Sequence, residues 1–224
     1  MHVVNASARS QVAFCAMQVL LTGFEPFGGS DVNPSALVAS QLAQEQWPGM
    51  SVVFRLLPVV TGTESGSARS VLAGAIAEVR PEVVICFGES ARAAHVTFER
   101  VAVNLRDGPT DNAGVRCVDM AVDEGGPAAH FATLPVRRMA NACESEGVPA
   151  VLSTSAGTFL CNEVLYALLD GAANRRWDFV RAAGFIHVPQ LPEQARVRGG
   201  PSMPLEHMVR GVRASVFCLG IPFG

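Results

Sequence analysis

Residues 149–162 read PAVLSTSAGTFLCN, and this stretch decides the fold class that we expect. Its apolar start, residues 149–152, is typical of a short buried strand, and apolar residues recur at helical spacing from Val164 to Leu169. The small residues from Ser155 to Gly157 permit a sharp turn between the two. A strand, a tight turn and a helix in this order are typical of an α/β protein, and they place Cys161 at a helix N-terminus.

This position favours a reactive thiol at Cys161. The positive end of the helix dipole and the N–H groups of the first turn favour the thiolate over the thiol. The same N–H groups can stabilise an oxyanion formed during acyl transfer. The alternative is that Cys161 is one more small buried hydrophobic residue, as many cysteines are. The local pattern alone leaves both interpretations open.

A thiolate needs a base, and His187 is the histidine best placed to be one. His2 lies close to the start of the sequence, and His207 falls on the expected surface of a helix that begins at Pro204. His187 follows the apolar residues 184–186 and so lies near the end of a short strand. Ligands of open α/β sheets bind at that edge. The alternative is a hydrogen-bonded histidine without a chemical role.

Glu99 is the candidate carboxylate. Strand alternation over residues 95–104 places Glu99 on a mostly apolar face, where a charge needs a partner. One possible partner is a neighbouring arginine, Arg92 or Arg100. The other is the imidazolium of His187, which Glu99 would orient as the third member of a nucleophile, base and orienter set. The spacing does not decide between them.

Four segments in chain order resemble the pyroglutamyl peptidase type I family of cysteine exopeptidases. Residues 20–35 (LLTGFEPFGGSDVNPS) resemble its opening strand and loop, and residues 88–104 (GESARAAHVTFERVAVN) resemble its glutamate signature. Residues 153–162 resemble its cysteine signature, and residues 184–195 (GFIHVPQLPEQA) resemble its histidine segment. The resemblance runs from about Val19 to about Arg213, which is nearly the whole chain.

The resemblance implies that Cys161 is the nucleophile, His187 the base and Glu99 the orienting carboxylate. It implies removal of an N-terminal pyroglutamyl residue from peptides through a thioester acyl-enzyme, with no metal and no organic cofactor. It also suggests a homotetramer. The alternative is a catalytically silent relative that binds pyroglutamyl peptides or serves as a structural subunit of an oligomer.

The resemblance also predicts a pocket for the lactam ring. The residues that it places there are Phe24, Phe27, Asn33, Glu89, Phe159 and Leu160. The phenylalanines would be flat apolar walls, although ordinary core packing is the alternative for each. Asn33 and backbone groups near Glu89 would satisfy the lactam N–H and carbonyl, because leaving either unpaired costs about 1–3 kcal/mol. The family that this chain resembles commonly carries Gln at position 89. Glu89 is tolerated there if the position contributes only backbone groups, whereas a carboxylate side chain that met the lactam carbonyl would repel it.

Composition excludes several other classes of protein. The 224 residues are 49% hydrophobic, carry a net charge of -3 and include no lysine, so no basic surface for nucleic acid is expected. No apolar run approaches the roughly 20 residues of a membrane helix. The six cysteines lack zinc spacing and predict reduced thiols in a cytoplasmic protein. The glycine-rich residues 23–30 lack the lysine of a phosphate loop.

The expected architecture is a single three-layer α/β/α domain, a parallel or mixed twisted sheet flanked by helices. Strands are expected at residues 18–22, 52–59 and 82–87, around Glu99, before Cys161 and at His187; helices are expected from Pro34, from a Thr61–Glu64 capping box to Val79, at 135–146, after Cys161 and from Pro204. Residues 108–126 are expected to form a long loop beside the site.

The catalytic domain is expected to comprise residues 17–224. Residues 1–16 precede the resemblance and are interpreted as a disordered tail or a misassigned start, with Met17 as the true start. A targeting role is the alternative, although the segment lacks a clear cleavage pattern.

Overall fold

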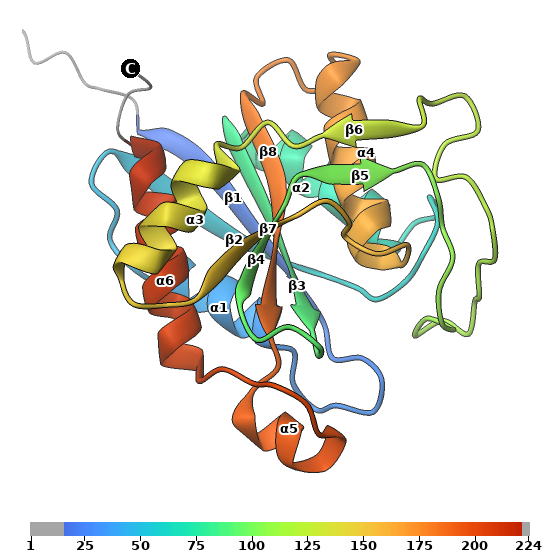
Figure 1. The fold of residues 1–224 in the computed structure, drawn as a ribbon. Coiled ribbons are helices and arrows are strands. Elements are labelled where there is room, and N and C mark those ends of the chain that lie inside the picture. Colours follow the sequence, from blue (N-terminus) through green and yellow to red (C-terminus); the bar gives the residue numbers. More distant parts are fainter. Residues whose placement is uncertain (1–15, 221–224) are drawn as a thin grey trace, which may run out of the picture.

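Six strands form one mixed sheet in the computed structural model, which describes residues 16–220 (Figure 1). In spatial order the strands are β2 (Met50–Leu57), β1 (Met17–Phe24), β3 (Val83–Ser90), β8 (Ala182–Pro189), β4 (Val96–Glu99) and β7 (Ala150–Ser153). The first four strands are mutually parallel. β4 runs antiparallel to β8, and β7 is parallel to β4. The expectation of a parallel or mixed sheet is confirmed, and the sheet is mixed.

Helices cover both faces of this sheet (Figure 1). One layer contains α1 (Pro34–Ala43), α3 (Val136–Ser145) and α6 (Leu205–Phe217), and the other contains α2 (Ala68–Val79) and α4 (Leu160–Ala173). The short helix α5 (Pro192–Arg198) follows β8 beyond the carboxyl ends of the parallel strands. A small two-stranded sheet of β5 (Val101–Val103) and β6 (Ala129–Phe131) packs against α4, and a 3-10 turn at Cys218–Gly220 ends the described chain.

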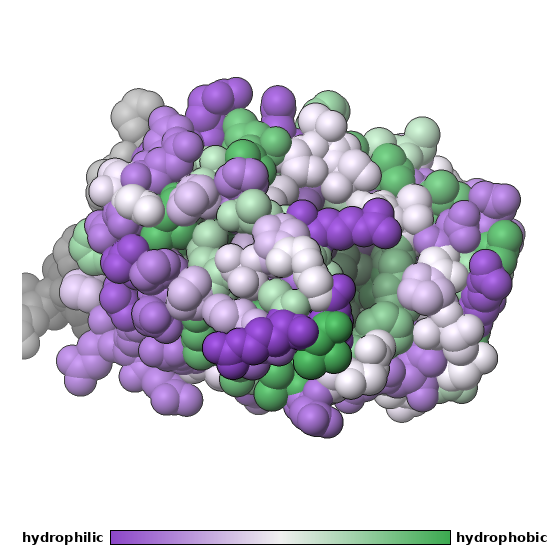
Figure 2. All heavy atoms as spheres, turned by 60° about the horizontal axis from the view of Figure 1, so that its bottom comes forward, coloured by the Kyte–Doolittle hydropathy of each residue, from purple (hydrophilic) through white to green (hydrophobic). Residues whose placement is uncertain are grey.

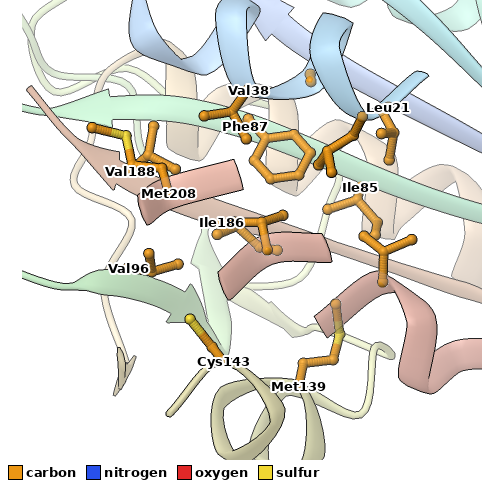
Figure 3. Close-up of a cluster of buried hydrophobic side chains, with 14 of the residues drawn as sticks. Leu21, Val38, Ile85, Phe87, Val96, Met139, Cys143, Ile186, Val188 and Met208 are labelled. Atoms are coloured by element: carbon orange, nitrogen blue, oxygen red, sulfur yellow. The ribbon is translucent and has the colours of Figure 1, made fainter. Parts of the chain in front are cut away.

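Alternation along the central strands sorts the core into two clusters, one on each face of the sheet. On β3, Val83, Ile85 and Phe87 face the α1, α3 and α6 layer, whereas Val84 and Cys86 face α2 and α4. Figure 3 shows the first cluster, in which side chains of the strands pack against the helices of that layer. Both faces of β3 are buried, as a central parallel strand between two helical layers requires.

The strand predicted to continue through Glu99 to Asn104 breaks at Arg100. β4 ends at Glu99, and the chain leaves the main sheet to pair β5 with β6. At the break the N–H of Arg100 donates to the Ser153 carbonyl, and the Arg100 carbonyl accepts from Ala132. The prediction that one alternating face continues past Arg100 is therefore wrong, because Arg100 is exposed where the chain passes between two sheets.

The predicted capping box at Thr61 and Glu64 is also wrong. The helix begins later, at Ala68, and its N-cap is Ser67, whose hydroxyl accepts from the N–H of Ser70 at 3.2 Å. The Thr61 hydroxyl instead donates to the buried Glu163 on α4. The Thr61 side chain, which the local spacing assigned to a helix cap, therefore bonds to a residue distant in the sequence instead.

Helix α5 was not predicted from the sequence, although a signal for it exists. Pro192 occupies its first turn, and the Gln194 side chain accepts from the N–H of Leu191 at 2.8 Å, as the last residue of a capping box does.

The interpretation of residues 1–16 as a tail or a misassigned start stays a prediction, because positions 1–15 lie outside the residues that the structure describes.

Candidate active site

The site forms where the carboxyl ends of β3 and β8 meet the start of α4. Gly88 on β3 is paired with His187 on β8. Phe185 and His187 are two residues apart and so point to the same face of the sheet, the face covered by α4. β7 runs opposite to these strands, and the connection at residues 154–159 returns the chain to their ends, where Cys161 lies against Gly88.

Glu99 bonds to His187 rather than to an arginine. The distance between His187 Nδ1 and Glu99 Oε1 is 2.8 Å, and the two residues are only 8% and 2% exposed. This bond uses Nδ1, so the other ring nitrogen, Nε2, is not engaged by Glu99. The second carboxylate oxygen of Glu99, Oε2, is buried and has no hydrogen-bond partner among the described residues. Because an unsatisfied buried group costs free energy, Glu99 is better explained by its effect on His187 than by stability.

His187 carries a raised pKa. Burial would by itself lower this pKa, but the charge and hydrogen bonding of Cys161, and then those of Glu99, raise it from 6.5 to about 10. The imidazolium is therefore the favoured form of His187 in this site. The Phe185 ring packs against the His187 ring, with 4.8 Å between the two centroids, and limits its movement.

Cys161 occupies the second position of α4. The helix begins after Phe159, and its first intrahelical bond runs from the Glu163 N–H to the Phe159 carbonyl at 3.0 Å. The N–H groups of residues 160–162 therefore precede the hydrogen-bond ladder of the helix and can point at an anion. The side chain of Asn162 is buried and bonds to the backbone of Val103 and Leu105 at 2.8–2.9 Å, which fixes the first turn.

Cys161 opens onto a cavity of about 350 Å³ that contains all six residues predicted for the ring pocket. Phe24, Phe27 and Phe159 line it, and the rings of Phe27 and Phe159 pair with 5.4 Å between centroids. Leu160 lines the cavity as well. Figure 2 shows the face at the carboxyl ends of the strands, which is hollowed, with hydrophobic surface inside and hydrophilic side chains at the rim.

Two polar residues of this cavity have other partners. The Asn33 side chain caps α1, because its oxygen accepts from the Ser35 N–H and hydroxyl, and its amide donates to the Glu25 carbonyl. The Glu89 carboxylate accepts from Arg198 Nη1 at 2.7 Å and from Gln194 Nε2 at 3.3 Å. The carboxylate at position 89 is therefore neutralised by a cation and is not directed at the ring alone.

A second cavity, of about 300 Å³, adjoins the first at Glu89. His187 and Glu99 line it, together with the small and polar residues of the loop at 153–157. The two cavities thus lie on either side of the Cys161 and His187 pair. One is lined by aromatic rings, and the other by polar and small residues.

Sequence reasoning missed Arg198, Gln194, Val59 and Ala91 as neighbours of the ring cavity. No local pattern identifies Val59 or Ala91. Arg198 could have been placed near the cavity from the sequence only if helix α5 had been predicted. Within residues 16–220, no group of three or more His, Cys, Asp or Glu side chains is arranged to hold a metal ion, and no helix has the length and apolarity needed to cross a membrane.

Gly88→Ala is expected to lower kcat/KM by at least about tenfold, because reaction rates fall steeply when reacting groups shift by an ångström. A Cβ at this position would lie 2.8 Å from Cys161 Sγ and 2.8 Å from the Phe185 ring, so the thiol or the ring must move. Steady-state kinetics check this, with thermal unfolding as the test of the fold. Gly74→Ala on the exposed side of α2 is the control, because nothing lies within 4 Å of its added Cβ. Full activity in Gly88→Ala would show that this close approach does not matter for the reaction.

The model of the pyroglutamyl peptidase family matches residues 17–219 of this chain. The chain is 45% identical over 200 residues to the pyrrolidone-carboxylate peptidase of Gloeobacter violaceus, covering 88% of this chain and 93% of the relative. It is 43% identical to the corresponding protein of Cupriavidus necator, with coverage of 88% and 90%.

Solved structures agree with these sequence matches. The crystal structure of pyroglutamyl peptidase I from Bacillus amyloliquefaciens superposes with a TM-score of 0.86 at 36% identity, covering 94% of this chain and all of that one. A mutant pyrrolidone carboxyl peptidase from Pyrococcus furiosus superposes with a TM-score of 0.82 at 35% identity, covering 89% and 96%.

Proposed function

The chain is a hydrolase that belongs to the pyroglutamyl peptidase family, and we propose that it removes the N-terminal pyroglutamyl residue from peptides by a Cys161, His187 and Glu99 mechanism. One observation carries the proposal: Cys161 lies between the hydrogen-bonded pair of His187 and Glu99 and a cavity walled by phenylalanines. The first arrangement suits acyl transfer, and the second suits a flat, uncharged ring.

Acylation proceeds by attack of the Cys161 thiolate on the carbonyl carbon of the pyroglutamyl residue. The N–H groups in the first turn of α4 stabilise the oxyanion, and the imidazolium of His187 donates its proton to the departing amine as the C–N bond breaks. The shortened peptide leaves with this proton, and a thioester remains on Cys161.

Deacylation uses the same groups in reverse. His187, now neutral, takes a proton from water, whose oxygen attacks the thioester carbonyl. The C–S bond breaks, and pyroglutamate is released with the thiolate and imidazolium restored. Glu99 acts by holding His187 through Nδ1 and stabilising its charged form, and it exchanges no proton itself.

The ring cavity suits the blocked N-terminus of such a substrate. A pyroglutamyl residue is a closed lactam and has no ammonium group, so its recognition must be apolar and directed at an amide. Phe24, Phe27 and Phe159 supply apolar walls, and Asn33 keeps one amide hydrogen beyond the one it gives to Glu25. These roles support the assignment of the cavity to the ring.

The remaining features stay predictions: a single catalytic domain over residues 17–224, a homotetramer, a cytoplasmic location, and catalysis without a metal or organic cofactor. The silent relative is the competing function. It is disfavoured because the bond between His187 and Glu99 buries a carboxylate oxygen without a partner, an arrangement that binding alone does not need.

A fluorogenic pyroglutamyl amide is expected to be cleaved by the purified protein, and the matched prolyl amide is expected to be cleaved much more slowly. Proline lacks the lactam carbonyl and carries a charged amine that must lose its water between aromatic rings. A site built to hydrogen-bond a substrate rejects such an analogue by roughly 10⁴ in kcat/KM. A preference for proline would reject the pyroglutamyl assignment, and no turnover of either amide would favour the silent relative.

A further inference from the structure

Three segments that are distant in the sequence meet beside the end of β3, around Glu89 and Gln194. Arg198, the last residue of α5, donates to Glu89 Oε1 at 2.7 Å. Gln194, one turn earlier, donates to Glu89 Oε2 and also to the Ser30 hydroxyl and the Val32 carbonyl. Gln194 therefore links α5 both to Glu89 and to the loop that carries Phe27, at the wall of the ring cavity.

This ion pair lies in the wall of the cavity and is partly exposed. Glu89 and Arg198 both line the cavity, and their side chains are 14% and 29% exposed. A carboxylate alone in this position would repel a lactam carbonyl and attract an ammonium group. Paired with a guanidinium, it adds no net charge to the cavity wall, and the planar guanidinium retains further N–H donors.

We propose that Arg198 is a specificity-determining residue, which cancels the charge of Glu89 and so makes the ring cavity select an uncharged lactam over an N-terminal ammonium. This inference rests on the proposed function, because it assigns the cavity to the pyroglutamyl ring. Arg198 gives the pair the neutrality that an uncharged amide at position 89 would have.

The test is a charge series at the two positions. The ratio of kcat/KM for pyroglutamyl and prolyl amides is expected to follow the net charge of the pair. Glu89→Gln (net +1) should give the highest ratio, wild type and Glu89→Gln/Arg198→Gln (both 0) should give similar ratios, and Arg198→Gln (net -1) should give the lowest. Each step should change the ratio by about tenfold, the size expected for a partly exposed charge a few ångströms from the ligand.

Two further variants separate charge from structure. Arg198→Lys keeps the positive charge and should stay close to wild type. Arg213→Gln breaks the ion pair between α6 and Glu45, which lies outside the ring cavity, and should leave the ratio unchanged. If Arg198 acts only by packing, its loss would lower kcat/KM for both amides together. If it acts by its charge, its loss should move kcat/KM for the two amides in opposite directions.

Binding of 2-pyrrolidone and of pyrrolidine, followed by NMR titration, repeats the series without turnover. An ordered series in this binding, in a protein that cleaves no pyroglutamyl amide, would support Arg198 as the selecting residue and reject the proposed hydrolysis. Turnover with an unchanged ratio in Arg198→Gln would overturn the inference and leave the proposed function standing. The inference would also be overturned if the double variant Glu89→Gln/Arg198→Gln had a ratio as low as that of Arg198→Gln. Restoring a neutral pair would then fail to restore selection for the lactam.

Discussion

Cys161→Ser is expected to lower kcat/KM for a pyroglutamyl amide by at least about 10³-fold, because a serine hydroxyl at its free pKa is a far poorer nucleophile than a thiolate. Its hydroxyl fits the space beside Gly88 that the thiol occupies, so unfolding and pyroglutamate binding should stay close to wild type. Kinetics and calorimetric binding on the same preparation measure both. Near-normal turnover in Cys161→Ser would contradict the proposed nucleophile.

Iodoacetamide gives a second readout of the same residue, because it should inactivate the wild type with labelling at Cys161. Burial raises the pKa of the thiols of Cys86 and Cys143 to about 12, and Cys218 is buried as well, so these three should react slowly. Cys117 is partly exposed and is the matched control: Cys117→Ser should be inactivated like wild type. Inactivation without a label on Cys161, mapped by mass spectrometry, would place the reactive thiol elsewhere.

His187→Ala is expected to lower kcat/KM by at least about 10³-fold and so remove nearly all turnover. Glu99→Gln should leave measurable residual activity, with kcat/KM lowered by roughly tenfold to a thousandfold. Glutamine keeps the shape and a hydrogen-bonding atom at Nδ1 of His187 but loses the charge that stabilises the imidazolium. Equal activity of Glu99→Gln and wild type would make the pair a purely structural contact.

The pH profile distinguishes these roles further. The pKa of His187 is raised to about 10, so activity that needs the imidazolium should fall as pH rises through that region. Glu99 is one of the causes of the raised pKa, and the alkaline limb of Glu99→Gln should therefore move to lower pH. A limb that does not move would show that Glu99 does not stabilise the charged form of His187.

Stability should follow the same titration. Because the pKa of His187 is higher in the folded protein than its ordinary 6.5, its contribution to the free energy of unfolding is full below about pH 6.5. The contribution is lost as pH rises toward about 10. Chemical denaturation of wild type and His187→Ala across this window measures it, and the difference between the two should shrink as pH rises.

The sequence by itself determined the class of fold and pointed to the residues that we propose for the chemistry. Periodic apolar runs predicted most of the strands and helices, because each buries one face or two against a neighbouring layer and the pattern is local. The small residues before Cys161 and the strand end at His187 predicted the positions of both side chains. All six residues expected around a ring do line one cavity.

Only the tertiary structure decided which partners these residues have. Glu99 had arginines nearby in the sequence, yet it bonds to His187, 88 residues away, because β4 enters the sheet antiparallel to β8 and carries Glu99 beside Phe185. Likewise, the partner of Glu89 is Arg198, 109 residues away, at the end of a helix that the sequence analysis missed. Propensity and periodicity act over a few residues, whereas an ion pair depends on the order and direction of strands that the whole chain must assemble.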